Sequence, residues 1–236
     1  MSSSFWPMRV GFKGVGLPVV FACAAFFVMA SSSQAALIGT VSTALSQTVI
    51  PGLVPPGTAA GTLLASLASP YSFSTTAGLT SGTLFTAVFK EAGGTLDFYY
   101  QVANSGTSAT AIARETDTNF AGFAIATGYR IDGGALGAGF TNGTVPPITA
   151  DLNSVGSVVG FSFSPPDAAK VLPGTTSSVL VISTSATSFT AGNAAIIDGG
   201  TQTVAAFQPS GVPEPGTMLL MGLGMVALAG LRRVRS

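Results

Sequence analysis

Residues 84–103 constrain the fold of this chain more than any other stretch. Along residues 95–103 an apolar set, formed by Leu96, Phe98, Tyr100 and Val102, alternates with a second set that includes Asp97 and Tyr99. A strict period of two is typical of a β-strand with one buried and one solvated face. The pattern predicts a hairpin of residues 84–90 and 95–103 around a turn at 91–94, with Asp97 and Tyr99 facing outward.

Similar short runs recur along the chain, separated by turn signals rich in Gly, Pro and Asn. We expect further strands at residues 37–50, 71–74, 109–114, 120–130, 155–164 and 177–183, and a closing hairpin of residues 194–197 and 201–207. Residues 61–69 fit either a strand or a short helix. Closely spaced strands with turns between them predict an all-β fold, an antiparallel β-sandwich ectodomain over residues 36–209.

Composition excludes several function classes for this domain. Residues 36–211 contain four basic and eight acidic residues, a net charge of −4, which argues against binding to nucleic acid or to anionic lipid. The chain has no histidine, and its single cysteine, Cys23, precedes the domain. The usual general base, a Ser-His-Asp triad and most zinc sites are therefore missing, and we expect no cofactor, no bound metal and no enzymatic activity.

Residues 1–35 have the pattern of a secretory signal peptide. Arg9 and Lys13 precede an uncharged apolar run at residues 14–30, and small residues follow it. We expect cleavage between Ala35 and Ala36 after export through the inner membrane by the Sec machinery. An uncleaved anchor is the alternative, because the apolar run is long.

The C-terminal residues 210–236 form a second targeting pattern. Val212, Pro213, Glu214 and Pro215 precede an uncharged apolar stretch that ends at residue 231, and Arg232, Arg233 and Arg235 follow. As a helix, residues 215–231 would measure roughly 25 Å, the short end of what crosses a bilayer. Clustered arginines favour the cytoplasmic side, so this single transmembrane helix would leave the domain outside.

This tail resembles the PEP-CTERM protein-sorting domain of Gram-negative bacteria. The resemblance covers about the last 25 residues and rests on the Pro213–Glu214–Pro215 triplet, the apolar span and the arginine cluster, in that order. It implies recognition by an exosortase, a multi-pass membrane transpeptidase or protease. An ordinary tail anchor after a proline-rich linker is the plainer alternative.

Two groups inside the domain are candidates for binding. Glu115, Asp117 and Asn119 alternate and could present oxygen ligands to calcium, but Phe120 stands where an EF-hand loop needs glycine. The alternative is a solvated strand edge. Asp97 and Tyr99 could mark a glycan-binding face, or could be an ordinary outward pair.

Together these features predict an exported, non-enzymatic surface or extracellular-matrix protein. Exosortase would process it from a transient single-pass form in the inner membrane, after which it would associate with exopolysaccharide in a biofilm. A membrane-tethered glycan-binding module is the first alternative. A polysaccharide hydrolase that uses two carboxylates is the second.

Overall fold

The computed structural model describes residues 40–41 and 47–211. The expected signal peptide, the Ala35–Ala36 cleavage site and the tail from Val212 onward lie outside these residues. Within the described part, no helix has the length and apolar character needed to cross a membrane.

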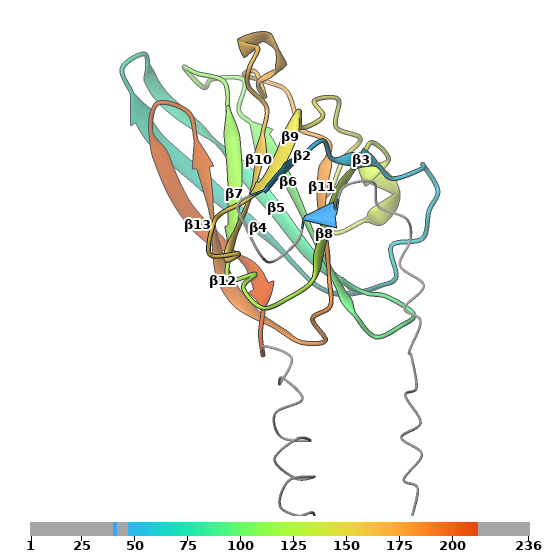
Figure 1. The fold of residues 1–236 in the computed structure, drawn as a ribbon. Helices are drawn as coiled ribbons and strands as arrows, with labels where there is room; N and C mark the ends of the chain where they lie inside the picture. The colour runs from blue at the N-terminus through green and yellow to red at the C-terminus, as the bar shows by residue number, and fades with distance from the viewer. Residues whose placement is uncertain (1–39, 42–46, 212–236) are drawn as a thin grey trace, which may run out of the picture. The chain divides into compact units, whose positions relative to one another are not determined.

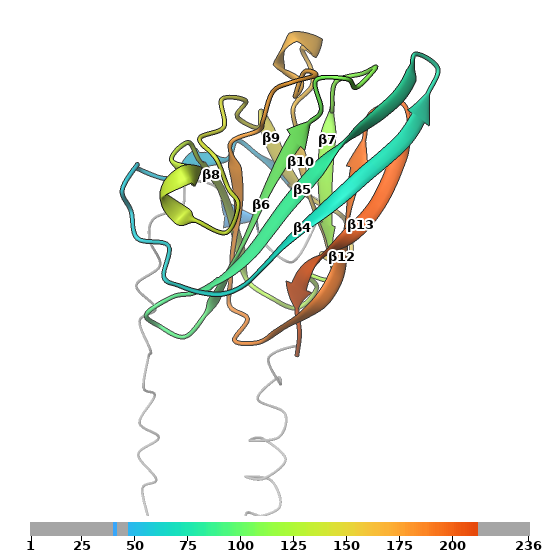
Figure 2. The same ribbon diagram turned by 180° about the vertical axis from the view of Figure 1, so that it is seen from behind.

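The described residues form two β-sheets (Figures 1 and 2). The first has seven strands, in the order β1 (Thr40–Val41), β8 (Ile125–Arg130), β11 (Val179–Thr184), β6 (Leu96–Asn104), β5 (Gly78–Lys90) and β4 (Thr62–Thr75), with β3 (Gly52–Leu53) added to β8 in parallel. The second has six strands, in the order β13 (Thr201–Pro209), β12 (Phe189–Ile197), β7 (Arg114–Thr118), β10 (Val158–Ser162), β9 (Thr149–Leu152) and β2 (Gln47–Val49). Apart from β3, every pairing is antiparallel. Two short 3₁₀ helices, η1 (Gly133–Leu136) and η2 (Asp167–Ala169), lie in the connections.

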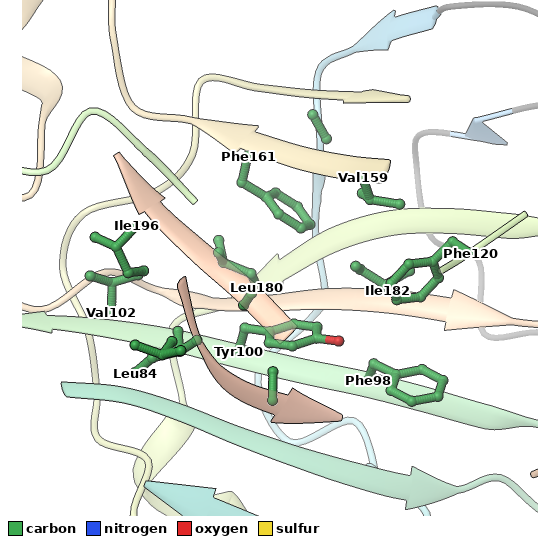
Figure 3. Close-up of a cluster of buried hydrophobic side chains, with 14 of the residues drawn as sticks. Leu84, Phe98, Tyr100, Val102, Phe120, Val159, Phe161, Leu180, Ile182 and Ile196 are labelled. Carbon is green, nitrogen blue, oxygen red and sulfur yellow. The ribbon is translucent and has the colours of Figure 1, made fainter. Parts of the chain in front are cut away.

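One apolar core joins the two sheets, as in a β-sandwich. Figure 3 shows side chains of the first sheet together with side chains of the second, among them Leu84, Phe98, Leu180, Phe161 and Ile196. All of these are fully buried. The apolar set of residues 95–103 therefore points into this core, as its period of two predicts.

Both predicted hairpins are confirmed. Strands β5 and β6 pair around the turn at residues 91–94, and β12 pairs with β13 around residues 198–200. The Ser69 hydroxyl also donates to the Ala205 carbonyl (2.6 Å), which joins β4 to β13 where the edges of the two sheets meet.

The expected solvated face of β6 is wrong. Asp97 is 8% exposed and Tyr99 3% exposed, because the outer face of the first sheet carries a second apolar cluster. Residues 133–141 cover this face, and their Phe140 ring lies near Tyr99 with ring centres 6.5 Å apart. A sheet that is covered on both faces has no wet side, which the alternation alone could not reveal.

Several strand boundaries differ from the prediction. Residues 61–69 and 71–74 are parts of one long strand, β4, so the strand alternative for the first of them is correct. Of the expected strand at residues 109–114, residues 109–113 form only an isolated bridge at Ile112, and Arg114 is the first residue of β7. Strand β8 begins at Ile125, because Phe120 and Phe123 lie in a turn that inserts both rings into the core.

Candidate functional site

The most unusual chemical group in the described residues is a pair of acids in the sandwich core. Glu115 and Asp117 are next-but-one neighbours on β7 and are 0% and 1% exposed. Their register partners on β10 are Phe161 and Val159, and those on β12 are Ile196 and Ala194. All four partners belong to the buried apolar core. The expected solvated strand edge is therefore wrong: these two side chains share the inner face of the second sheet.

Among the described residues, no well-formed hydrogen bond reaches this pair. None of the four carboxyl oxygens of Glu115 and Asp117 accepts a hydrogen bond. Burial raises the pKa of both carboxyls, and in Asp117 the nearby charge of Glu115 raises the pKa further. An ionised carboxylate without a donor is costly in an apolar interior, so the neutral form is favoured.

Tyr100 is the polar group that the opposite sheet brings to the pair. Its side chain is fully buried (Figure 3), and its pKa is raised well above the usual value, first by burial and then by the charges of Asp117 and Glu115. Its hydroxyl donates to the Phe207 carbonyl at 2.8 Å. A phenol has a single O–H hydrogen, so Tyr100 cannot donate fully to both Phe207 and Asp117. Its hydrogen bond toward Asp117 lowers the pKa of that acid, but the effect of burial is larger and the pKa stays raised.

The predicted calcium ligands do not meet. Asn119 is exposed beyond the end of β7, with a left-handed backbone (φ 67°), and its amide nitrogen donates to Gln208 Oε1 at 2.6 Å. Glu115 and Asp117 face the core instead. In the described ranges no group of three or more Asp, Glu, Cys or His side chains could hold a metal ion.

The other side of β7 carries a bidentate ion pair. Arg114 donates through Nη1 and Nη2 to the two carboxyl oxygens of Asp151 on β9, at 2.6 and 2.7 Å. On its way it crosses β10, where it also donates to Ser162 Oγ and lies directly over Gly160. Gly160 therefore leaves room that a larger residue would fill, and the pair fastens three adjacent strands together.

The other predicted candidate, Asp97 with Tyr99, lies under the cover of the first sheet. Burial raises the pKa of Asp97 to about 7, against a smaller opposing effect of its hydrogen bond with Ser183. Both side chains are too buried to contact a sugar in this arrangement. Sequence reasoning missed the Glu115–Asp117 pair as a core feature, since the polar run from Arg114 to Thr118 carries no apolar signal.

Hydrogen bonds to Ser188 hold Ser210, which lies at the end of the part of the chain that the structure describes. Ser210 donates its backbone N–H to the Ser188 carbonyl at 3.0 Å, and the Ser188 hydroxyl donates to the Ser210 carbonyl. Gly211 follows with a φ of 75°. Strand β13 thus leads almost directly into Val212, the first residue of the tail motif.

Comparison with protein-family models identifies one feature. Residues 211–234 match the model of the PEP-CTERM protein-sorting motif. No curated protein and no solved structure matches the chain. The match covers the tail and begins after strand β13.

The chain thus carries a PEP-CTERM protein-sorting motif directly after the last strand of its all-β domain. The motif indicates an exported protein that an exosortase sorts to the cell envelope or surface.

Proposed function

We propose that the protein is a non-enzymatic component of the cell surface or extracellular matrix. Its sandwich would be released or attached by exosortase processing at the tail and would associate with exopolysaccharide. The observation that carries this proposal is the sorting motif at residues 211–234, placed directly after the last strand of the domain.

The positions of the acidic side chains support a non-enzymatic role. A carboxylate-based glycoside hydrolase needs two acids about 5–9 Å apart across a cleft. Among the described residues, the acids that would be candidates are buried or engaged. Glu115 and Asp117 lie in the core, and Asp97 lies under a cover. Glu91 is in direct hydrogen-bond contact with Asp97, which is too close for that mechanism, and Asp132, Asp151, Asp167 and Asp198 form ion pairs.

The surface also favours this role over that of a dedicated glycan-binding module. Such a module generally presents aromatic rings on which sugars stack. Among residues 47–211 the exposed large apolar side chains are all aliphatic: Ile50, Leu53, Leu63, Leu64, Leu79, Ile131, Val155 and Leu172. Association with polysaccharide would then depend on hydrogen bonds from the Ser- and Thr-rich strands.

Intact-mass measurement of the protein from its native host, with and without the host exosortase, tests the sorting part. We expect a mature N-terminus at Ala36 in both strains, and loss of residues after the Pro213–Pro215 triplet only when the enzyme is present. A full-length tail in both strains would make the segment a plain anchor. Cosedimentation of the mature protein with host exopolysaccharide tests the matrix part, and failure to cosediment would remove it.

A further inference from the structure

We propose that Glu115 and Asp117 form a proton-holding lock in the sandwich core: the domain closes around the pair in its protonated form, and proton release in alkaline medium loosens strand β7. This inference is independent of the sorting signal. It rests on the burial of the two acids, on the lack of hydrogen bonds to their four oxygens among the described residues, and on the direction of the Tyr100 hydrogen bond.

The groups that face the pair leave it without a compensating charge. On strands β10 and β12, the residues that pair with the two acids are all apolar. The opposite sheet presents Tyr100. The cation Arg114 precedes Glu115 on the same strand and favours its ionised form. The Arg114 guanidinium, however, donates to Asp151 and Ser162 on the outer side of the sheet.

The direction of the Tyr100 hydrogen bond indicates which form of the acids fits. The hydroxyl hydrogen is donated to the Phe207 carbonyl at 2.8 Å, and in this arrangement the oxygen is left to accept. A carboxylate would have to compete with the Phe207 carbonyl for the one phenol hydrogen, whereas a carboxylic acid carries its own. Two neighbouring carboxyls can also share a proton between them, as like charges in one site do.

A cation would fit this place less well than protons do. Calcium takes six to eight oxygen ligands. Two carboxyls from adjacent positions on one strand supply at most four oxygens, and the backbone carbonyls around them take part in the ladders of β7 with β10 and β12. The apolar partners add no ligand.

The sign of the pH effect follows from the protons that the folded state holds. When the pKa of an acid is higher in the folded than in the unfolded chain, its contribution to stability is complete at low pH. That contribution is lost as the pH rises from the unfolded value through the folded one. Each proton that the folded domain holds in excess lowers the folding equilibrium constant about tenfold per pH unit over that window. The lock is therefore closed in acid and weakened in alkali.

The test is equilibrium denaturation of the full-length chain in mild detergent between pH 5 and pH 9, followed by circular dichroism. We compare the wild type with the double variant E115Q/D117N, whose amides resemble neutral carboxyls in shape. We expect the wild-type folding constant to fall with pH about tenfold more per unit, for each proton held, than that of the double variant. Asp97 and the other acids contribute equally to both proteins and cancel. The matched control is D167N, an acid whose side chain is 87% exposed, which should keep the wild-type slope.

Equal slopes in the wild type and the double variant would overturn the proposal. If the double variant does not fold, infrared spectra of the variant D97N in heavy water decide instead, because Asp97 also has a raised pKa and would add its own band. A protonated-carboxyl band at neutral pH in D97N that is lost in alkali supports the lock, and its absence refutes it. Calcium chloride is added in a parallel series. Stabilisation by calcium at neutral pH, with loss of the pH slope, would identify a cation site and overturn the proton lock.

Discussion

Replacing Gln101 by leucine should loosen the cover on the outer face of the first sheet. Gln101 is fully buried on β6, and its amide makes three hydrogen bonds to backbone groups. Nε2 donates to the carbonyls of Thr141 and Ser177, both at 2.8 Å, and Oε1 accepts from the Thr141 N–H at 2.9 Å. The side chain therefore connects residues 133–143, which lie over the first sheet, to the strands beneath them.

The size of the effect follows from the groups that lose a partner. Leucine is similar in volume to glutamine but leaves two carbonyls and one N–H unsatisfied. Each buried group without a partner costs about 1–3 kcal/mol. Because the Thr141 groups are only partly buried and water can reach them, we expect about 3–5 kcal/mol in total. That is a large share of the ~5–15 kcal/mol that stabilises a typical domain.

Urea denaturation measures the loss, and hydrogen exchange locates it. We expect a lower midpoint, and faster exchange first in residues 133–143. The matched control is Gln202→Leu, since the Gln202 amide has one hydrogen bond, an exposed one to the neighbouring Thr203 carbonyl, and should cost no more than ~0.5 kcal/mol. Equal losses in the two variants, or unchanged exchange in the cover, would refute the assigned role of Gln101.

Three further predictions concern single positions. Gly143→Ala should cost at least ~2 kcal/mol in urea denaturation, because its Cβ would collide with the Ser177 carbonyl, whereas Gly93→Ala enters open space and should be near neutral. Asp97→Asn should gain stability relative to the wild type as the pH rises from about 4 to 7. Burial raises the Asp97 pKa to about 7, so the protonated acid of the wild type loses its contribution to stability over that window. Parallel curves of stability against pH for the two proteins would contradict this. Glu214→Ala should block removal of the tail while leaving export intact, as read by intact mass and by periplasmic fractionation; a trimmed variant would mean that the triplet is not the recognised feature.

Much of the fold could be predicted because each local pattern agreed with its tertiary environment. The alternation of Leu96, Phe98, Tyr100 and Val102 matched the core of the sandwich, and the glycine turns at 91–94 and 198–200 set both hairpins. The tail was recognisable because its order of triplet, apolar span and arginines is local and needs no folding to be read.

The buried acids could not be predicted, since their environment comes from distant parts of the chain. The polar sequence of β7, from Arg114 to Thr118, predicts a strand exposed to solvent. In the structure, β10, β12 and Tyr100 enclose the inner face of this strand. In the same way, nothing near Tyr99 shows that residues 133–141 fold back over it. Burial of one strand by segments far away in the sequence leaves no trace in that strand's own pattern.

The distribution of charge gives the proposed matrix association a property that can be measured. Three of the four basic residues between 36 and 211 are used within the domain, in the pairs Arg114–Asp151, Arg130–Asp132 and Lys170–Asp198. Arg130 also donates to the Thr58 carbonyl at 2.6 Å. Its buried guanidinium therefore holds the loop at Thr58 in place and is not presented to solvent.

A surface of this kind offers little positive charge to an acidic polysaccharide. If the domain associates with the matrix, uncharged hydrogen bonds must supply the affinity, and screening leaves these largely intact. We therefore expect the cosedimented protein to stay bound when the salt concentration is raised to ~1 M, where the screening length falls to about 3 Å. A denatured sample of the same chain is the control for trapping. Release by salt alone would show that ionic contacts dominate, and the argument from the paired cations would then be wrong.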